Sequence, residues 1–383
     1  MKKRILIMSF GSDAGGIERS LIEFLRFLES RQKFEISLYL WRKPGILFNQ
    51  LPISVNILNQ RLVPGRITEF KEYRGIFKKF GYVLWYLLFR ISTLLNLKTL
   101  AFKKMKDRYD IAISYCQNGY SPYYIIDKVQ ADKKYIWYHH GTYERRGSLK
   151  RIDEQYFRKY DNIIAVSNAC KIMLEKSFPG LSSKILVIPN LIDRETILRK
   201  AELPLKDRDN TAETLKIVTV GRLAPEKGQM LALNAARILH EKNISFQWYF
   251  VGDGEDFRAC QDFISVHHMK EVCFLTGATQ NPYSYMKMAN IYVQPSLIES
   301  ECLTIKEAKY LKKLIIATNI PAINEVLEDG KYGILCEPNA ESFAHAILNM
   351  ISDTNIRNSL TSNLSSLKMN NKKQENIIMK ILS

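Results

Sequence analysis

The sequence predicts an α/β protein made of two Rossmann-like domains in tandem, each containing a parallel sheet. Short apolar runs alternate with longer stretches of helical period along the whole chain, which is typical of βα units. A polar and charged stretch between Asp193 and Leu215 separates two such series. At 383 residues the chain also exceeds the length at which a single hydrophobic core normally stops growing, so two domains are expected.

The first half is expected to be doubly wound, and its first unit is the clearest. An apolar run at 5–10 leads into a glycine-rich turn at 11–16 and then into an amphipathic stripe that starts at Ile17. Further strands are predicted at 34–40, 111–115, 135–138, 163–166 and 185–188. The second half repeats the pattern, with strands predicted at 215–220, 247–251, 272–275, 291–294 and 314–317. The expected domains are residues 1–192 and 215–360, with a linker at 193–214 and a helical tail at 361–383.

Composition indicates the class of protein and its compartment. Apolar residues make up 46% of the sequence and charged residues 25%, as in a globular protein rather than a disordered or membrane-spanning one. The six cysteines are scattered singly, without the close pairing of a zinc site or a redox motif, so we expect no metal and a reducing compartment. The basic start precedes an apolar run that is too short for a signal peptide, which favours a cytoplasmic protein.

A basic segment at 61–106 concentrates much of the net charge of +17. Its eleven Lys or Arg residues stand at 61, 66, 71, 74, 78, 79, 90, 98, 103, 104 and 106, against two acids, Glu69 and Glu72. The apolar and aromatic stretch inside it is shorter than a membrane-spanning helix needs. Two interpretations stay open: a helix in the headgroup region of an anionic leaflet, or a helical subdomain packed on the protein with a solvated basic face. No nucleic-acid motif accompanies the charge, so nucleic acid is not an expected partner.

Ligands of open parallel sheets bind beyond the carboxyl ends of the strands, so the loops there are the candidate sites. After the first strand, Gly15 and Gly16 let backbone amides approach a ligand at a helix N-terminus, although a glycine pair is often only a turn. After the first strand of the second half, Arg222 and Lys227 stand five apart on a short loop, where they can converge on an anion such as a diphosphate. The alternative for that loop is a solvated basic surface.

A third candidate loop follows the strand predicted at 291–294. If a helix begins near Leu303, Glu299 lies at the turn before it and Glu307 on its next turn. The amides around Leu303 and Thr304 would then face a phosphate, flanked by two carboxylates able to hold sugar or ribose hydroxyls. If this motif stood alone, a capped surface helix would be the better interpretation.

These motifs occur together and in one order, which is more specific than any of them alone. They are Gly-Gly-Ile-Glu-Arg at 15–19, Ile-Pro-Asn-Leu-Ile-Asp at 188–193, Gly-Arg-Leu-x-x-Glu-Lys-Gly at 221–228, Val-Gly-Asp-Gly-Glu at 251–255 and the pair Glu299 and Glu307. In this combination the chain closely resembles the retaining glycosyltransferases of family four, whose bacterial members build capsule, O-antigen or related polysaccharides. The resemblance spans nearly the whole chain and implies the GT-B fold, in which two Rossmann-like domains with parallel sheets face a central cleft.

The resemblance also implies a role for each candidate residue. Arg222 and Lys227 would bind the donor diphosphate and stabilise the negative charge that grows on it as the glycosidic bond breaks. Glu307 would bind the nucleotide ribose, and Glu299 would hold the transferred sugar near its reacting face. The glycine pair would bring amides toward the phosphates from the opposite domain. The first domain would thus bind the acceptor, and the second the nucleotide-sugar donor, with a UDP-sugar expected.

One further site and one departure follow from the same comparison of patterns. Relatives have a Trp-x-His pattern that Trp137 and His139 match, which implies that His139 lies in the cleft and assists the acceptor hydroxyl; His140 is the competing candidate. Many relatives continue from the first glutamate as Glu-Gly-Phe-Gly, whereas Ser, Glu and Cys occupy 300–302 here. This departure leaves the donor sugar open and complicates the assignment of Glu299.

The family implies front-face attack, in which the acceptor hydroxyl enters beside the departing phosphate and that phosphate takes its proton. No metal is expected, because the Arg and Lys side chains can neutralise a diphosphate. The acceptor would be a glycan or a lipid-linked precursor, and the protein would be peripheral on the inner face of the cell membrane. Two rivals stay open: a GT-B sugar-nucleotide epimerase, and a non-catalytic membrane-associated partner of a glycan-assembly complex.

Overall fold

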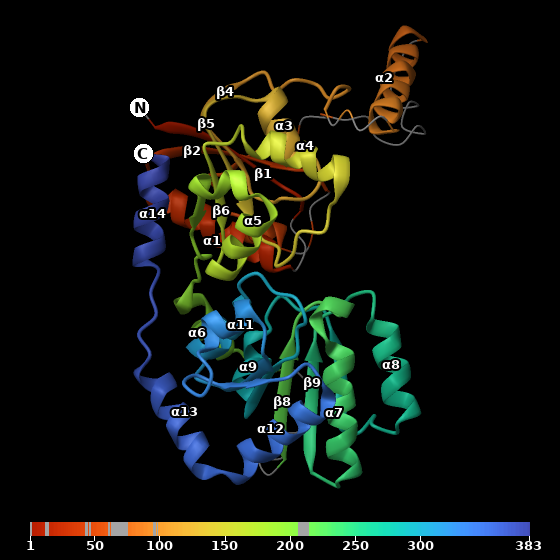
Figure 1. Cartoon of the computed structure of the whole chain (residues 1–383), viewed down its shortest axis with the longest axis vertical. Coiled ribbons are helices and arrows are strands. Elements are labelled where there is room, and N and C mark those ends of the chain that lie inside the picture. The colour runs from red at the N-terminus through yellow and green to blue at the C-terminus, as the bar shows by residue number, and fades with distance from the viewer. Residues whose placement is uncertain are drawn as a thin grey trace.

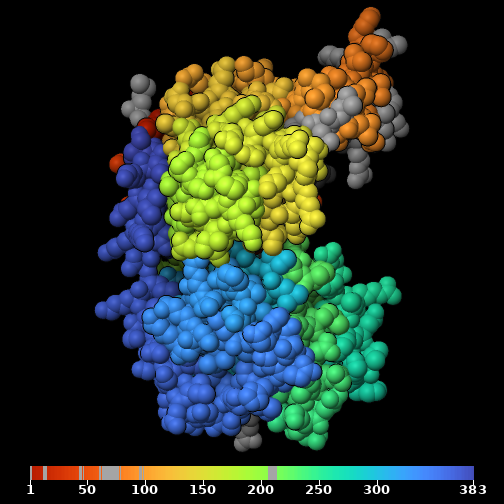
Figure 2. Space-filling view, in the orientation of Figure 1, coloured from red at the N-terminus to blue at the C-terminus, as the bar shows by residue number. Residues whose placement is uncertain are grey.

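The chain folds into two α/β lobes, which the computed structural model places one above the other (Figure 1) and which meet at a waist (Figure 2). The structure describes residues 2–11, 15–42, 45, 47–59, 62, 76–94, 97, 99–205 and 214–383. The predicted α/β class with two parallel sheets is confirmed. The basic segment predicted at 61–106 lies only partly within the described residues.

The N-terminal lobe contains a seven-stranded parallel sheet in the order β3-β2-β1-β4-β5-β6-β7. Its strands are β1 (Lys3–Ser9), β2 (Phe34–Leu40), β3 (Asn56–Ile57), β4 (Arg108–Ser114), β5 (Gln130–Tyr138), β6 (Asn162–Ala165) and β7 (Ile185–Val187). Its helices are α1 (Gly16–Ser30), α2 (Ile76–Leu94), α3 (Ser121–Lys128), α4 (Gly147–Phe157) and α5 (Asn168–Ser177). The strand order reverses between β1 and β4, so the carboxyl ends of these two strands mark the expected ligand crevice of this lobe.

The C-terminal lobe contains a six-stranded parallel sheet in the order β10-β9-β8-β11-β12-β13. Its strands are β8 (Leu215–Val220), β9 (Phe246–Val251), β10 (Cys273–Gly277), β11 (Ile291–Gln294), β12 (Leu314–Thr318) and β13 (Ile334–Cys336). Its helices are α6 (Arg194–Ala201), α7 (Gln229–Glu241), α8 (Phe257–Val266), α9 (Tyr283–Met288), α10 (Leu303–Tyr310), α11 (Pro321–Leu327), α12 (Ala340–Ser352) and α13 (Thr354–Ser366). The order reverses between β8 and β11.

The apolar runs form these strands because both faces of each sheet are covered. Residues Ile5 to Met8 of β1 are fully buried, as expected for a central parallel strand with helices on both sides. In the second sheet Trp248 stacks on Phe250 with ring centroids 5.5 Å apart. The strands predicted at 34–40, 215–220 and 291–294 match the observed ones residue for residue, while the short edge strands β3 and β13 were not predicted.

The expected linker at 193–214 begins with ordered structure. Asp193 caps α6 by accepting a hydrogen bond from the Thr196 amide at 3.0 Å. Ile197 and Ala201 on α6 are buried in the core of the C-terminal lobe. The charged residues of this stretch therefore include an amphipathic helix. Its only buried residues are the two apolar ones, so the polar composition of the stretch did not indicate a helix.

The C-terminal end of the chain returns to the N-terminal lobe, where both termini lie (Figure 1). Helix α14 (Lys372–Leu382) buries Ile378 and Leu382 in the core that β1 and α1 share. Tyr135 donates a hydrogen bond to the Ile381 carbonyl at 2.6 Å. The tail predicted at 361–383 thus ends as part of the first core, an assignment the sequence analysis did not make.

Candidate functional site

The loops that follow β8 and β11 are bound to each other at the point where the second sheet reverses its order. The Glu226 carbonyl accepts hydrogen bonds from the amides of Leu297 at 2.9 Å and Ile298 at 3.2 Å. Gly228 has a left-handed φ of 68°, and a Cβ at this position would lie 2.0 Å from the Pro295 carbonyl oxygen. Only glycine fits both the backbone conformation and this close approach. The two loops therefore act as one platform at the switch point.

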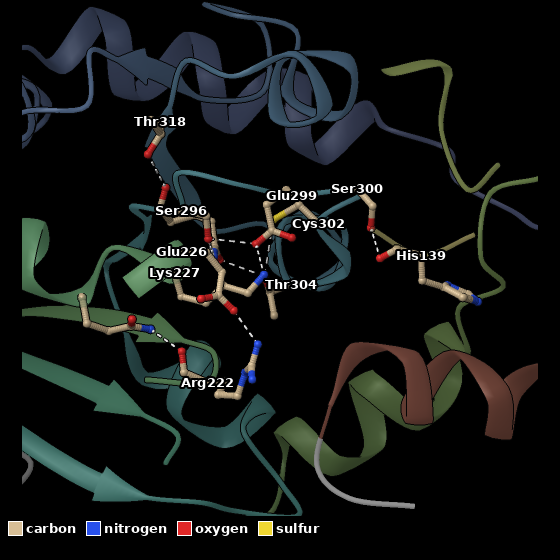
Figure 3. Close-up of polar contacts among 12 residues, drawn as sticks. His139, Arg222, Glu226, Lys227, Ser296, Glu299, Ser300, Cys302, Thr304 and Thr318 are labelled. Carbon is tan, nitrogen blue, oxygen red and sulfur yellow. Dashed lines mark hydrogen bonds and ion pairs between the residues drawn. The ribbon is translucent and has the colours of Figure 1, made fainter. Parts of the chain in front are cut away.

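Lys227 and Glu299 form an ion pair on this platform, with Nζ and Oε1 2.7 Å apart (Figure 3). Ser296 donates a second hydrogen bond to the same carboxylate oxygen at 2.8 Å. Burial alone would lower the pKa of Lys227, but the Glu299 carboxylate raises it above its ordinary value, so the ammonium stays charged. The structure thus brings together two of the predicted site residues, which come from positions 72 residues apart.

Arg222 belongs to the same cluster but has a different partner (Figure 3). Its guanidinium pairs with Glu226 of the same loop, and its side chain is 63% exposed. The Arg222 carbonyl accepts a hydrogen bond from the Gln229 amide side chain at 2.9 Å, which fixes the backbone of the loop. Each cation therefore has a carboxylate partner, and an exposed Arg222 can turn toward an anionic ligand at little cost.

Helix α10 begins at Leu303, as predicted. Cys302 precedes it in a left-handed conformation with φ 53°. The Thr304 hydroxyl donates to the Gln294 side chain at 2.8 Å, and Gln294 in turn donates to Ser296 at 2.8 Å. This chain of hydrogen bonds links the end of β11 to the start of α10, beside the carboxylate of the ion pair.

Glu307 is buried on α10, where two residues from other elements hold one of its oxygens. Tyr283 of α9 donates to Oε1 at 3.0 Å, and Arg19 of α1 lies 3.6 Å from the same oxygen. Burial raises the pKa of Glu307, and Arg19 and Tyr283 offset this only in part. The other oxygen, Oε2, is buried without a hydrogen-bond partner. The residue Glu307 lines a cavity together with Arg19, Tyr283 and Leu303.

The N-terminal lobe approaches this site through its predicted glycine turn. Gly15 is the N-cap of α1, which begins at Gly16. A Cβ on Gly16 would lie 4.0 Å from Cδ1 of Leu303, so the N-termini of α1 and α10 lie close to each other across the lobes. The turn residues 12–14 lie outside the described residues.

His139 follows β5 on the same side of the N-terminal lobe and is 8% exposed. Its ring lies 4.9 Å from that of Tyr115, and its Nε2 atom is buried without a partner. Burial lowers the pKa of His139 to about 3, so the imidazole is neutral at physiological pH. His140 is engaged elsewhere, because its Nδ1 contacts the backbone and hydroxyl of Thr142. Of the two histidines, His139 is the one whose Nε2 is buried without a partner.

Backbone contacts join the His139 segment to the Glu299 loop. The Ser300 hydroxyl donates to the His139 carbonyl at 2.9 Å (Figure 3). A Cβ on Gly141 would lie 2.2 Å from the Glu299 carbonyl oxygen, so glycine is required for the two loops to pass each other. The residue expected to assist the acceptor hydroxyl, on one lobe, and the candidate sugar-binding carboxylate of the other are therefore held in a fixed relation.

Glu301, the additional glutamate within the departure at 300–302, has a different position from Glu299. Its carboxylate is 2% exposed and pairs with Lys306. Both of its oxygens accept from the Asn190 amide at 3.0 Å, at the crossing between the lobes. Burial raises the pKa of Glu301, and Lys306 and Asn190 offset this in part. Glu301 is thus a connection between the lobes, whereas Glu299 belongs to the charged cluster.

Sequence reasoning did not find three residues of the site. Arg19, Tyr283 and Glu226 contact the predicted residues Glu307 and Arg222, and none was assigned a role. Arg19 and Glu226 stood within the quoted motifs, which was an available signal; Tyr283 stood in none. Among the residues that the structure describes, no group of three or more His, Cys, Asp or Glu side chains could hold a metal ion.

The fold and the site define a two-lobed α/β transferase of the GT-B type. Two family models match most of the chain: Glycosyltransferase Family 4 over residues 14–196, and Glycosyl transferases group 1 over residues 205–366. The chain belongs to the GT-B glycosyltransferases of family 4. The family that the sequence motifs predicted is therefore confirmed.

Individual relatives are distant. An uncharacterized glycosyltransferase of Methanocaldococcus jannaschii is 28% identical over 214 residues, 51% of this chain and 52% of its own length. The UDP-Gal:alpha-D-GlcNAc-diphosphoundecaprenol alpha-1,3-galactosyltransferase of Escherichia coli is 28% identical over 208 residues, 52% of this chain and 54% of its own length. The chain thus spans about half the length of the curated relatives it matches.

Solved structures show the same fold over the whole length. The Anabaena protein HepE in complex with UDP and glucose superposes with a TM-score of 0.72 at 17% identity, covering 99% of both chains. A glycosyltransferase from Rickettsia africae superposes with a TM-score of 0.71 at 19% identity, covering 99% of this chain and 97% of its own. At these identities the likeness establishes the fold alone.

Proposed function

We propose that this glycosyltransferase transfers a hexose, with retention of anomeric configuration, from a nucleotide-diphosphate donor to a glycan or lipid-linked acceptor in cell-surface polysaccharide biosynthesis. The observation that carries the proposal is the ion pair of Lys227 and Glu299 at the switch point beside the N-terminus of α10. A UDP-sugar is the proposed donor. HepE was crystallised with UDP-glucose, and the name of the Escherichia coli relative specifies UDP-Gal and a diphosphoundecaprenol acceptor.

The donor would bind across this platform with its charges matched by the protein. The diphosphate lies against Arg222, Lys227 and the amides of Leu303 and Thr304, where two cations and a helix N-terminus supply positive potential. The glycine pair at the start of α1 supplies amides from the facing lobe. No metal is part of the proposal, because these groups neutralise the diphosphate.

Glu307 and Glu299 would bind hydroxyl groups at the two ends of the donor. The free Oε2 of Glu307 is a buried acceptor without a donor, which a ribose hydroxyl would satisfy. Glu299 has one oxygen occupied by Lys227 and Ser296, so its carboxylate is oriented before the sugar arrives. A carboxylate that is already oriented loses less conformational entropy on binding a hydroxyl than a mobile carboxylate does.

The proposed reaction is a front-face displacement. The acceptor oxygen forms a bond to the anomeric carbon while the bond from that carbon to the phosphate oxygen breaks, and the electron pair leaves with the phosphate. The proton of the acceptor hydroxyl passes to the same departing phosphate oxygen. Arg222 and Lys227 stabilise the charge that develops there, and neutral His139 helps to orient the acceptor hydroxyl without taking its proton. Retaining glycosidases use a carboxylate as nucleophile instead, but Glu299 is already held by Lys227.

The acceptor and the location are part of the same proposal. A lipid-linked acceptor would be reached at the cytoplasmic face of an anionic membrane, with the protein in peripheral contact. No helix among the described residues has the length and apolar character to cross a bilayer.

A thermal-shift screen of the purified protein against UDP-, GDP-, dTDP- and ADP-sugars tests the donor, because a ligand that binds only the folded state raises the melting temperature. We expect one nucleotide class to stabilise the wild-type protein and Lys270→Ala, an exposed control, but not Lys227→Ala. No shift with any donor would favour the non-catalytic partner. Epimerised free sugar nucleotide without acceptor would favour the epimerase, and an inverted product would overturn retention.

A further inference from the structure

Helix α2 presents an apolar stripe to solvent at the edge of the N-terminal lobe, where it projects away from the sheet (Figure 1). The large side chains of the stripe are between 43% and 89% exposed: Phe77, Phe80, Leu84, Leu87, Leu88, Ile91 and Leu94. Six of them recur at alternating spacings of three and four, so they lie on one face of the helix. A contiguous apolar face of this kind marks an interaction surface.

The opposite face of α2 anchors the helix on the protein. Tyr82 and Ser92 on that face are buried, at 3% and 2% exposure. The Trp85 indole donates a hydrogen bond to the Ala101 carbonyl at 2.6 Å, and the Phe89 ring lies 5.8 Å from that of Phe102. The exposed stripe is therefore not the face by which α2 packs on the protein, because the opposite face already makes those contacts.

The charges around α2 decide which partner the stripe fits. The helix contains no Asp or Glu, and Arg90 is exposed on it. Lys103, Lys104 and Lys106, just beyond it, are also exposed, and Lys103 lies 4.4 Å from the Trp85 ring. A second copy of the chain packed on this stripe would bring these cations together. An anionic bilayer would pair them with lipid phosphates while burying the apolar side chains.

We infer that α2 is a docking helix that lies in the headgroup region of an anionic lipid bilayer, with the stripe from Phe77 to Leu94 in the acyl boundary. The anchored face then holds the N-terminal lobe against the membrane. This inference rests on the peripheral membrane contact of the proposed function and names the helix that makes it. Membrane binding requires neither donor nor acceptor, so it can fail while the transfer reaction stands.

Co-sedimentation with vesicles tests the inference independently of activity. The wild-type protein is compared on phosphatidylcholine vesicles with and without phosphatidylglycerol, at low and high salt. We expect binding to the anionic vesicles that weakens with salt, and little binding to the neutral ones. Equal binding to both, or no binding to either, would overturn the inference.

Two triple variants separate the stripe from general surface hydrophobicity. Phe80→Ser/Leu84→Ser/Leu87→Ser removes exposed side chains of the stripe, so the fold should be retained, which circular dichroism checks. We expect this variant to lose about tenfold or more of vesicle affinity, because each buried apolar side chain contributes to partitioning. The matched control alters three exposed apolar residues elsewhere, Ile53→Ser/Ile172→Ser/Val266→Ser, and should bind as the wild type does.

The second-copy alternative has its own measurement. Sedimentation velocity across a range of concentrations would detect a dimer, and a dimer that the stripe variant abolishes while vesicle binding stays intact would overturn the inference. A monomer at all concentrations, with anionic binding lost in the stripe variant alone, supports it.

Discussion

Each lobe contributes one surface to the candidate site, called its wall below, and the two walls differ in charge and in how they are held. The C-terminal wall carries paired charges on loops bound to each other: Lys227 with Glu299, and Arg222 with Glu226. The N-terminal wall contributes a neutral, buried His139 and the glycine N-cap of α1. Under the proposed function, this difference would assign stabilisation of developing charge to the C-terminal wall and the space for the acceptor to the N-terminal wall.

The largest effect should come from removing the cation of the ion pair. Lys227→Ala deletes charge at the departing phosphate and frees Glu299 to move, so we expect a loss of kcat of roughly 100- to 1000-fold, as for other preorganised charge stabilisers. The measurement is steady-state transfer with the donor that the thermal-shift screen identifies. Lys270→Ala should keep wild-type activity. A similar loss of kcat in both variants would mean that Lys227 has no specific role in catalysis.

Breaking the connection between the walls should have the next largest effect. Glu301→Ala leaves Lys306 and the Asn190 amide without their partner in a buried setting, which costs about 3 kcal/mol of unfolding free energy. Glu301→Gln keeps a hydrogen-bonding group and should cost less. Denaturant unfolding of both variants measures the change in unfolding free energy. Equal stability of Glu301→Ala and the wild type would mean that the contacts of Glu301 at the lobe crossing do not stabilise the fold.

The close approach of backbones in the C-terminal wall can be tested at one glycine. Gly228→Ala puts a Cβ 2.0 Å from the Pro295 carbonyl oxygen and also strains a left-handed backbone. We therefore expect denaturant unfolding to show a loss of about 2 kcal/mol or more of unfolding free energy. Gly277 provides the matched control, because its φ is also positive, at 73°, but no atom lies within 4 Å of an added Cβ. Gly277→Ala should therefore cost only about 1 kcal/mol, the strain alone.

Several parts of this comparison could be predicted from the sequence, and others could not. The loops of Lys227 and Glu299 follow β8 and β11, whose apolar runs are distinct, so both the strands and the site at their ends were predictable. The partners of Glu307 were not, because Arg19 and Tyr283 come from elements far apart in the chain and meet only after the lobes assemble.

The burial of Glu301 and the packing of helix α14 could not be predicted from sequence patterns, for a physical reason. Glu301 is of a residue type that usually lies on the surface, and its burial is tolerable only because it pairs with Lys306 and, across the lobe crossing, with Asn190. Helix α14 is rich in polar residues, and only Ile378 and Leu382 enter the distant N-terminal core. Both features depend on contacts between segments that are remote in sequence, which periodicity does not report.

The pH dependence of stability tests whether His139, on the N-terminal wall, is neutral in the folded protein. Its folded-state pKa of about 3 lies below the unfolded value of about 6.5, so folding favours the neutral ring. Stability from this difference is present above pH 6.5 and is lost as the pH falls toward 3. His139→Gln should remove this dependence, so that the variant loses less stability than the wild type between pH 7 and pH 4, by about 3 kcal/mol.

Activity of the same variant separates a structural from a chemical role. If neutral His139 orients the acceptor hydroxyl, His139→Gln should lower kcat by about tenfold without changing the shape of the pH profile between 5 and 8, where the imidazole does not titrate. A wild-type profile that falls with a pKa near 6.5, and that His139→Gln flattens, would contradict a neutral imidazole.

The smallest effect should appear at the outer edge of the interface between the lobes. Glu325 of α11 accepts hydrogen bonds from the amides of Asn168 and Ala169, both at 3.0 Å, and so caps α5 of the other lobe. These contacts are exposed, so Glu325→Ala should cost only about 0.5–1 kcal/mol of unfolding free energy. Glu328→Ala, an exposed acid on the same lobe that pairs with Lys331, is the control. Since Glu325 holds the lobes together without touching either wall, its loss should raise KM for the donor slightly and leave kcat unchanged. A fall in kcat comparable to that of Lys227→Ala would instead mean that the position of the lobes, and not the charge on one wall, controls the chemical step.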